Sequence, residues 1–410
     1  MCLVRWIAVA IVVALTACKA AESPSSLHED AMAAVVQAKA DLIAFRHDLH
    51  RFPELAGNEQ RTSAKIADAL TALGFDVRSG VGGYGVVATL QGQKDGPLIA
   101  FRADMDAVSG DAIDPVSYRS QVEGVHHTCG HDIHSTIGIG LAAGFAAIQT
   151  ELPGKVMLIF QPAEEAGVGA EDMLADDVFA DQLPDAIFAV HVAPFDIGTL
   201  TALPDGMLAG RTRIEVTLSG SGDLERAVNE VTAAIAANGN ITLDTMLSFQ
   251  TEPFVFIDFL PRTEAENTNV IVSAFVMSAG LSERPKVQER LTRSVEAVDV
   301  EGITATIAFS QALEGVNNDA ELLALASQGI KKRASDVKLI PTPGVIPAFS
   351  EDFGSFQKAV PGVMYMLGVN NPAAGTVGFP HSPDFVGDDA AIAVGTEAML
   401  AAMLQLMATE

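Results

Sequence analysis

Cysteine is scarce in this chain, and so are basic residues. The 410 residues include three cysteines, and 25 Lys and Arg stand against 52 Asp and Glu, for a formal net charge of −27. So few cysteines exclude a small disulfide-stapled scaffold. The excess of negative charge would repel a phosphate backbone, which excludes nucleic acid as a partner.

Charged residues as a group are also few, at 19% of the chain, whereas apolar residues make up 49%. A chain with so much apolar surface is not extensively disordered. It contains no internal repeat and no low-complexity tract. A length of 410 residues predicts two or three domains rather than one.

The first residues have the pattern of an export signal. Arg5 precedes an apolar run from Trp6 to Ala17, which is too short to cross a bilayer, since a crossing needs about 20 residues. Leu15-Thr16-Ala17-Cys18 resembles the processing box of bacterial lipoproteins, in which the cysteine is lipidated. An ordinary secretory signal with a chance cysteine is the alternative.

This pattern predicts a lipoprotein signal peptide at 1–17 and a tether at 18–27. The membrane would hold the chain only by a lipid anchor at Cys18, and the exported protein would face the periplasm. Lys19 is compatible with sorting to the outer membrane. A lipidated Cys18 would leave Cys129 without a partner for an internal disulfide.

Strands and helices alternate over the first half of the chain. Apolar runs predict strands at 85–90, 98–102, 155–160 and 186–192, and the remaining patterns predict helices at 28–51, 61–73 and 132–149. Continuous apolar strands that alternate with helices are typical of a mostly parallel sheet covered on both faces. We therefore predict an α/β domain.

After residue 206 the expected order changes to βαββαβ, the order of a ferredoxin-like domain. The predicted elements are strands at 213–218, 254–260, 269–277 and 303–309 and helices at 223–237 and 283–298. A helix at 320–333, a strand at 363–367 and a helix at 389–407 then resume the first domain. The predicted division is a first part at 28–206, an inserted domain at 207–314 and a second part at 315–410.

Four separate segments carry side chains that can bind metal or accept a proton. They are Cys129 with His131, Glu164 with Glu165, His191, and His381. Each alone has a plain structural explanation: a buried cysteine, an acidic turn, a core histidine and a rigid turn beside proline. Together the four segments offer a thiolate, imidazoles and two carboxylates, several of them at the carboxyl ends of predicted parallel strands. This set fits a two-metal site better than it fits four separate structural roles.

At these residues the sequence resembles peptidase family M20, the aminoacylase and carboxypeptidase metallohydrolases. The resemblance is to the amidohydrolase branch with hippurate hydrolases and auxin-conjugate (IAA-amino acid) hydrolases, and it runs from about Ala44 to Met407. The segments that carry it are Arg46–Leu55, Arg102–Ala107, His127–His134, Phe160–Glu165, and Glu351–Phe353 with Pro380-His381.

The resemblance implies a zinc-exopeptidase-like catalytic domain with an inserted lid and dimerisation domain. It implies two divalent metal ions, Zn²⁺ or Mn²⁺ with Co²⁺ or Ni²⁺ as competitors, and a homodimer through the inserted domain. The implied ligands are Cys129, His131, Glu165, His191 and His381, with Cys129 between the two ions. Glu164 would be the general base in hydrolysis of a small-molecule amide. Asp104, Asp106, His127, Asp132 and His134 would surround the ligands.

The inserted domain departs from the family pattern. The family's Gly-Gly-His-Ala loop, whose histidine helps to hold the tetrahedral intermediate, is absent, since 218–223 reads Leu-Ser-Gly-Ser-Gly-Asp. No histidine lies between His191 and His381, and Phe275–Ser278 replaces the strand that carries a substrate-contacting arginine. Arg262, Asn267 and Asn269 are candidate substitutes, with ordinary turn residues as the alternative.

Three hypotheses follow from this pattern. The first is a metal-dependent amidohydrolase that cleaves N-acyl amino acids or small peptide-like conjugates, which the intact Glu164 favours. The second is a weakened or inactive relative that binds metal or an amide ligand, which the altered inserted domain favours. The third is a structural lipoprotein whose inserted domain only dimerises.

Overall fold

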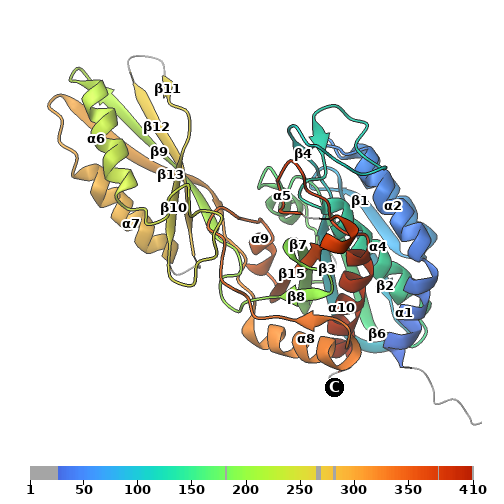
Figure 1. Ribbon diagram of the computed structural model, residues 1–410. Helices are drawn as coiled ribbons and strands as arrows, with labels where there is room; N and C mark the ends of the chain where they lie inside the picture. Colours follow the sequence, from blue (N-terminus) through green and yellow to red (C-terminus); the bar gives the residue numbers. More distant parts are fainter. Residues whose placement is uncertain (1–25, 181, 265–268, 280–282, 377, 409–410) are drawn as a thin grey trace, which may run out of the picture.

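The computed structural model describes residues 26–180, 182–264, 269–279, 283–376 and 378–408. The predicted signal peptide and most of the predicted tether lie outside the described residues. The chain forms a large α/β domain and a smaller domain that projects from it (Figure 1). The smaller domain is inserted between β8 (Thr199–Thr201) and α8 (Ala320–Arg333).

The large domain is built on an eight-stranded sheet with the order β1-β2-β6-β3-β7-β15-β8-β14. Its other strands are β1 (Asp76–Val81), β2 (Gly85–Gln91), β3 (Lys94–Asp104), β6 (Pro153–Gln161), β7 (Ala186–Asp196), β14 (Lys338–Leu339) and β15 (Gly362–Asn370). The four central strands, β6, β3, β7 and β15, are parallel to one another. Their carboxyl ends therefore meet at one edge of the sheet, where ligands gather in α/β folds.

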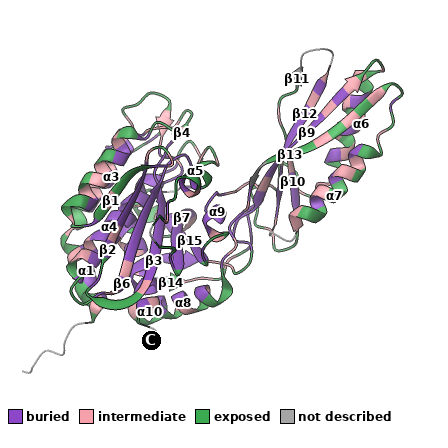
Figure 2. Cartoon of the chain, turned by 180° about the vertical axis from the view of Figure 1, so that it is seen from behind, coloured by how far each residue is buried: buried purple, intermediate pink, exposed green. Residues whose placement is uncertain are grey.

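Helices cover both faces because neighbouring residues of each buried strand point to opposite sides. In β3, Ile99 and Phe101 belong to one apolar cluster, and Leu98 and Ala100 belong to another. The first cluster includes residues of α1 (Leu27–Gln37), α2 (Lys39–Arg51), α3 (Gln60–Ala72), α4 (His131–Ala147), α8 and α10 (Ala390–Met407). The second includes residues of α5 (Gly169–Ala175) and α9 (Gly354–Gln357). The strands between these layers are largely buried (Figure 2).

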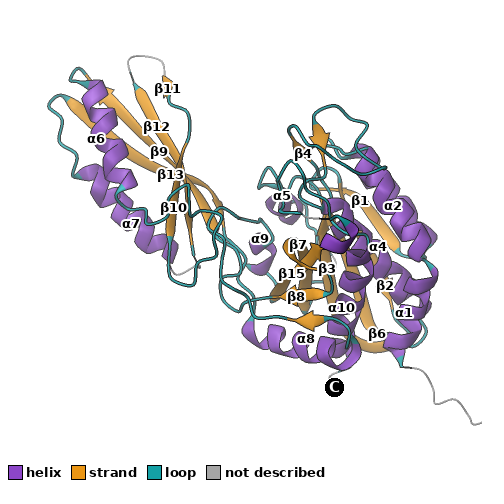
Figure 3. Cartoon of the chain, viewed as in Figure 1, coloured by secondary structure: helices purple, strands orange, loops and turns teal. Residues whose placement is uncertain are grey.

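The inserted domain is an antiparallel sheet with two helices on one face (Figure 3). Its elements are β9 (Gly210–Gly220), α6 (Leu224–Ala236), β10 (Val255–Phe259), β11 (Thr263–Glu264), β12 (Val270–Ser278), α7 (Glu283–Glu296) and β13 (Ile303–Leu313). The order β10-β12-β9-β13 is that of a ferredoxin-like fold, with β11 as a short extra pairing on β12. The predicted fold class is confirmed, including the inserted βαββαβ unit.

Two expectations from the sequence need correction. The helix predicted at 28–51 is two helices, because Ala38 has ψ −3°, far from the helical value of about −42°. The pattern also missed the edge strands β1 and β14 and the short strand β8 beside β14. β1 is mostly exposed, and β8 and β14 have three and two residues, so none of them has the apolar run that marked the central strands.

The C-terminal helix α10 is long and apolar enough by length and composition to cross a membrane. Most of its residues are buried, and it packs against α4 and α8. A helix that is apolar all round is expected in the core of a large domain. We therefore assign α10 to the core of the α/β domain.

Candidate metal centre

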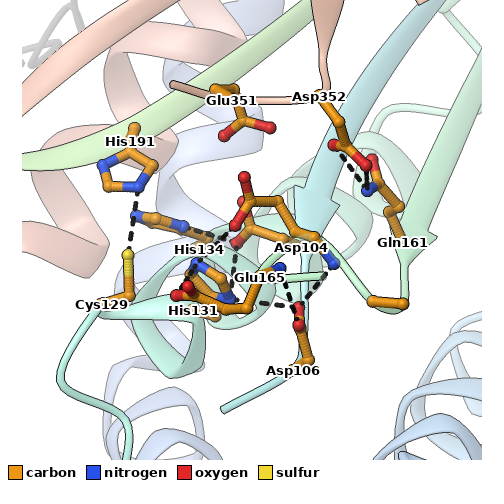
Figure 4. Close-up of polar contacts among 12 residues, drawn as sticks. Asp104, Asp106, Cys129, His131, His134, Gln161, Glu165, His191, Glu351 and Asp352 are labelled. Atoms are coloured by element: carbon orange, nitrogen blue, oxygen red, sulfur yellow. Dashed lines mark hydrogen bonds and ion pairs between the residues drawn. The ribbon is translucent and has the colours of Figure 1, made fainter. Parts of the chain in front are cut away.

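Cys129 and His131 are held by a tight turn that opens α4. Gly130 between them has φ 82°, a left-handed conformation that glycine adopts without strain. A Cβ on Gly130 would lie 2.7 Å from Cγ2 of Val192, so the turn packs directly on β7. The turn brings the thiol and the first imidazole of α4 to the carboxyl edge of the sheet (Figure 4).

Glu164 and Glu165 follow β6 in a loop that is fixed through its backbone. Ala163 has φ 54°, and its N–H donates to Oε1 of Glu59. The next two N–H groups, of Glu164 and Glu165, donate to Oδ1 and Oδ2 of Asp106 at 3.2 and 3.0 Å. One buried carboxylate therefore sets the direction of both glutamate side chains. Backbone strain of this kind is common at functional sites.

His191 and His381 complete the set from two other elements. His191, on β7, donates Nδ1–H to the carbonyl oxygen of Val192 at 2.8 Å, and its Nε2 lies 3.4 Å from Sγ of Cys129. His381 has φ 65°, and its N–H donates to the carbonyl of Thr128 at 2.8 Å. Nε2 of His381 lies 3.3 Å from Oε1 of Glu165. The structure thus brings together all five residues that the resemblance implied as ligands.

The donor atoms of these residues fit a bound cation. Both ring nitrogens of His131 and Oε1 of Glu165 are buried without a hydrogen bond in the described part of the chain. Nε2 of His131 lies 3.8 Å from that oxygen, although a hydrogen bond would bring the atoms closer. Two atoms that bind one ion at about 2.1 Å with tetrahedral angles lie about 3.4 Å apart.

Cys129 is common to two donor groups, one with His131 and His191 and one with Glu165 and His381. The atoms within each group lie within 4.8 Å of one another. A thiolate that faces both groups can bind two cations. This arrangement matches the chemistry of paired divalent metal sites, in which imidazole, carboxylate and thiolate ligands occur together.

The charges at the site favour an added cation. Burial, followed by the carboxylates of Glu165 and Glu164, raises the pKa of Cys129 well above its usual value. Burial also raises the pKa of Glu164 well above its usual value, and the negative charge of Glu351 adds to the effect. Burial would raise the pKa of Glu165 as well, but His381 and His131 lower it to about 2.

Asp104 and His134 form hydrogen bonds that hold β7 next to the predicted ligands. Oδ1 of Asp104 accepts a hydrogen bond from Nδ1 of His134 at 2.7 Å, and Nε2 of His134 accepts one from the N–H of Val192. His134 therefore fixes β7 beside His191. It is a structural link between α4 and β7, because its two ring nitrogens are already satisfied.

Asp132 anchors the first turn of α4. It accepts hydrogen bonds from Nε of Arg46 at 3.1 Å and from Nδ1 of His50 at 2.9 Å. His127, which was also predicted to surround the ligands, is buried, and neither of its ring nitrogens has a hydrogen bond within the described chain. Four of the five expected surrounding residues thus have hydrogen bonds in the described part of the chain, whereas His127 has only a ring contact with His50, at 6.2 Å between the ring centres.

A cavity of about 280 Å³ opens above the donor atoms. Its lining includes Cys129, Glu164, Glu165, His191 and His381 from the large domain and Leu208, Arg211 and Leu313 from the chain at the base of the inserted domain. Arg211 was not among the site residues predicted from the sequence. A basic residue close to the predicted domain boundary at 206/207 was the one signal that could have identified it.

The substitutes proposed from the sequence do not line this cavity. Arg262 binds Glu225 at 2.8 Å beside β11, at the end of the inserted domain farthest from α9 (Figure 1). Asn269 precedes β12 at the same end, and Asn267 lies outside the described residues. β9 ends at Gly220 and Asp223 caps α6, so the junction between them is as short as the sequence indicated.

Comparisons with known proteins agree with this geometry. The family model for peptidase family M20/M25/M40 matches residues 100–405. The N-acetylcysteine deacetylase of Bacillus subtilis (strain 168) is 31% identical over 369 residues, which cover 87% of this chain and 94% of that protein. An IAA-amino acid hydrolase of Arabidopsis thaliana, ILR1-like 6, is 31% identical over 367 residues, covering 85% and 76%.

Solved structures show the same fold. The YXEP protein of Bacillus subtilis, described as a dinuclear metal-binding peptidase of the M20 family, has a TM-score of 0.75 and 28% identity, covering 90% of this chain and 99% of that one. A putative aminohydrolase from methicillin-resistant Staphylococcus aureus has a TM-score of 0.80 at 23% identity, covering 93% and 100%. With the family model and these relatives in agreement, this chain belongs to peptidase family M20/M25/M40, a family of metal-dependent hydrolases of amide bonds.

Proposed function

We propose that this protein cleaves the amide bond of N-acyl amino acids or of small peptide-like conjugates. The observation that carries the proposal is the convergence of five donor side chains and Glu164 at one cavity, which all of them except His131 line. Two divalent cations bound by these residues would acidify a water molecule and polarise the carbonyl of the substrate. The two relatives named above are an N-acetylcysteine deacetylase and an IAA-amino acid hydrolase, and both names describe hydrolysis of an N-acyl amino acid.

We assign Cys129, His131, Glu165, His191 and His381 as the metal ligands. Cys129 would serve both ions, because its Sγ is shared by the two donor groups. Nδ1–H of His191 is held by the carbonyl of Val192, which leaves Nε2 as the donor. The ligand set accepts Zn²⁺ or Mn²⁺, and metal analysis of protein purified from its own host identifies the ion used.

Glu164 is the general base in this proposal. Its carboxylate lies 3.8 Å from Nε2 of His131 and is held in place through the backbone by Asp106. It takes a proton from the attacking water and passes that proton to the nitrogen of the leaving amine, so that the acid and the free amine are the products. Glu351, which also lines the cavity, raises the proton affinity of Glu164 by its negative charge.

The test is release of a primary amine from a panel of N-acyl amino acids and dipeptides. A chain that starts at Ser23 keeps the Ser26 cap of α1, and it is assayed with Zn²⁺ or Mn²⁺. Glu164→Gln is expected to lower kcat by about 10²–10⁴-fold while two metal ions per chain remain bound. Glu171→Gln removes an exposed carboxylate from α5 and is expected to change nothing.

An equally active Glu164→Gln variant would disprove the assigned base. Two bound metals with no turnover on any substrate would favour the second hypothesis, a relative that binds metal without hydrolysing amides. That hypothesis rests on the altered inserted domain, which lacks the family's loop at 218–223 and has no histidine to offer, since none lies between His191 and His381.

We also propose that the protein is exported and anchored by a lipid at Cys18. The support is the sequence of 1–18 alone, with its short apolar run and processing box. Cys18→Ser is expected to abolish labelling with radioactive palmitate and to release the protein from the membrane fraction. Palmitate labelling that persists in the variant would contradict the proposal.

A further inference from the structure

A fully buried glutamate, Glu59, contacts the loop that carries the proposed base. Its Oε1 accepts hydrogen bonds from the N–H of Ala163 at 2.8 Å and from the N–H of Gly57 at 2.9 Å. Within the described residues its Oε2 is buried without a hydrogen bond. Burial raises the pKa of Glu59, and the negative charge of Asp106 adds to the effect. A carboxyl group in such a place lowers stability, so its presence needs another reason.

Capping of a helix is not that reason. Glu59 occupies the N-cap position of α3, but its side chain forms no capping hydrogen bond. The N–H groups of Arg61 and Thr62, in the first turn of α3, donate instead to Oε1 and Oε2 of Glu54, at 3.0 and 2.7 Å. Glu54 therefore supplies the acceptors that an N-cap side chain usually provides. The carboxyl group of Glu59 is not required for this purpose.

Ala163 is the point at which the base loop needs support. It has φ 54°, a left-handed conformation that is unfavourable for a residue with a Cβ. Its carbonyl accepts a hydrogen bond from the N–H of Gly169 at 3.2 Å, and its N–H is the group that donates to Glu59. The next residue along the chain is Glu164. The bond to Glu59 thus holds a strained residue directly before the base, and such strain persists only where neighbouring contacts impose it.

Glu59 and Asp106 hold this loop together. Three successive N–H groups, those of Ala163, Glu164 and Glu165, donate to the two carboxylates at 2.8, 3.2 and 3.0 Å. Asp106 follows β3 and Glu59 precedes α3, so the loop is held from two separate parts of the large domain. A change in φ at Ala163 would move the carboxylate of Glu164, which lines the cavity. The contact with Glu59 therefore bears directly on where the base lies.

We propose that Glu59 is a positioning residue for hydrolysis: it fixes Ala163 in its left-handed conformation and so holds the carboxylate of Glu164 in its place at the cavity. This inference rests on the proposed amide hydrolysis and adds to it a residue that acts through the base without contacting the substrate. The role requires the acceptor oxygen of Glu59 and does not require its negative charge. Glutamine keeps one such oxygen and should therefore replace it.

The experiment measures hydrolysis by metal-loaded variants of Glu59, with the N-acyl amino acid that the wild type cleaves fastest in the panel above. Glu59→Ala is expected to lower kcat by about 10- to 100-fold with KM nearly unchanged, because a displaced base slows the chemical step more than it weakens substrate binding. Glu59→Gln is expected to keep kcat within about threefold of the wild-type value, since its side-chain oxygen can accept the same two hydrogen bonds.

Glu54 provides the matched control. It is also a glutamate that accepts two backbone N–H groups, and it lies in the same connection between α2 and α3, but both of its bonds go to α3. Glu54→Ala is expected to lower the melting temperature and to leave kcat unchanged. If Glu59→Ala acted only by weakening the fold, the two variants would lose kcat in proportion to their losses of melting temperature.

Amide hydrogen exchange supplies a readout that does not depend on turnover. Glu59→Ala is expected to speed exchange at the N–H of Ala163 by about tenfold or more, because that group loses its acceptor. Exchange in α4 and β7 is expected to stay at the wild-type rate. Glu59→Gln is expected to keep the protection of Ala163, and Glu54→Ala is expected to change exchange only at the start of α3.

Each outcome bears on the inference. An unchanged kcat in Glu59→Ala would overturn it, and so would a Glu59→Gln enzyme as slow as Glu59→Ala, because the charge would then matter rather than the acceptor. Faster exchange throughout the large domain in Glu59→Ala would also overturn it, by making Glu59 a residue of general stability.

If the wild-type enzyme hydrolyses no member of the panel, the proposed function fails, and exchange alone decides the role of Glu59. Unchanged exchange at Ala163 in Glu59→Ala would then overturn that role. A loss of protection that is confined to the base loop and is restored in Glu59→Gln would support it.

Discussion

The two domains differ in what they bury. The large domain buries charged and ionisable side chains at the carboxyl edge of its sheet, among them Arg46, Arg102, Asp104, Asp106, His131, Asp132, Glu164 and Asp352. In the described part of the inserted domain the buried polar residues are Thr212, Ser273 and Ser278, none of them charged. Both regions are folded parts of one chain, but among the described residues only the large domain buries charged side chains.

This difference in buried charge shows which parts of the protein give up stability for function. A buried charge is expensive unless it is paired, and well-packed apolar groups of the same size often serve stability as well or better. The inserted domain is stabilised in this second way, by an apolar layer between its sheet and its two helices. The large domain departs from it wherever a side chain holds, orients or neutralises the donor set. Loss of a charged residue should therefore have very different effects in the two regions.

The largest expected effect is at Arg102. This fully buried side chain donates to Asp104, Glu351 and Asp352 at 2.6, 2.8 and 3.1 Å. Arg102→Gln leaves those carboxylates uncompensated and is expected to cost about 3–5 kcal/mol in urea unfolding. Arg226→Gln on α6, which breaks an exposed pair with Glu230, is expected to leave the unfolding midpoint unchanged. Similar losses of unfolding free energy in both variants would contradict the expected difference between the two domains.

The second largest expected effect is the pH-dependent contribution of His50 to stability. Burial alone would lower the pKa of His50, but Asp132 and Asp114 outweigh it and raise that pKa to about 9. Since the folded pKa exceeds the unfolded value of about 6.5, the charged histidine stabilises the fold fully below pH 6.5 and loses this effect as the pH rises through about 9.

His50→Gln is therefore expected to cost about 3 kcal/mol at pH 6 and much less at pH 10. Urea unfolding of wild type and variant over that range measures the difference. A constant difference from pH 6 to pH 10 would show that the charge of His50 has no part in stability.

Much of this arrangement could be predicted from the sequence, for a physical reason. Residues that end parallel strands lie at one edge of the sheet whatever the loops do, so Glu165 after β6 and His191 on β7 were expected at the same edge, where β3 separates their two strands. Cys129 and His131 were tied to the same edge by the helix that follows them. The family and fold class are confirmed, and the ligand roles stay predictions.

The rest depends on contacts that no local pattern encodes. Asp106 holds the glutamate loop by accepting two backbone N–H groups, and such a pairing leaves no signature in spacing. Arg211 lines the cavity from the second position of β9, at the base of the inserted domain, and no local pattern shows that this end of the strand faces the donor residues. The break at Ala38 and the short strand β14 depend likewise on packing rather than on local propensity.

A third prediction compares two glycines in left-handed backbone. Gly130→Ala forces φ 82° on a residue with a Cβ 2.7 Å from Val192, so we expect a loss of about 2 kcal/mol and a fall of about 10²-fold in kcat/KM as Cys129 shifts. Gly302→Ala in the inserted domain has φ 75° but its nearest atom is at 3.3 Å, and we expect about 1 kcal/mol with unchanged activity. Equal effects on kcat/KM would contradict the assignment of chemistry to the large domain.

The smallest effect tests whether the two regions differ in anything besides buried charge. Asp223 caps α6 by accepting from the N–H of Arg226 at 3.0 Å, and Asp319 caps α8 by accepting from the N–H of Leu322 at 2.8 Å. Asp223→Ala and Asp319→Ala should each cost about 1 kcal/mol with kcat/KM unchanged, since a cap satisfies the same orphan donors in either domain. Equal losses of stability in thermal unfolding would mean that the two domains differ only in the ionisable groups at the sheet edge. A much larger loss for Asp319→Ala would instead mean that the large domain transmits local strain to its metal centre, and then kcat/KM should fall with it.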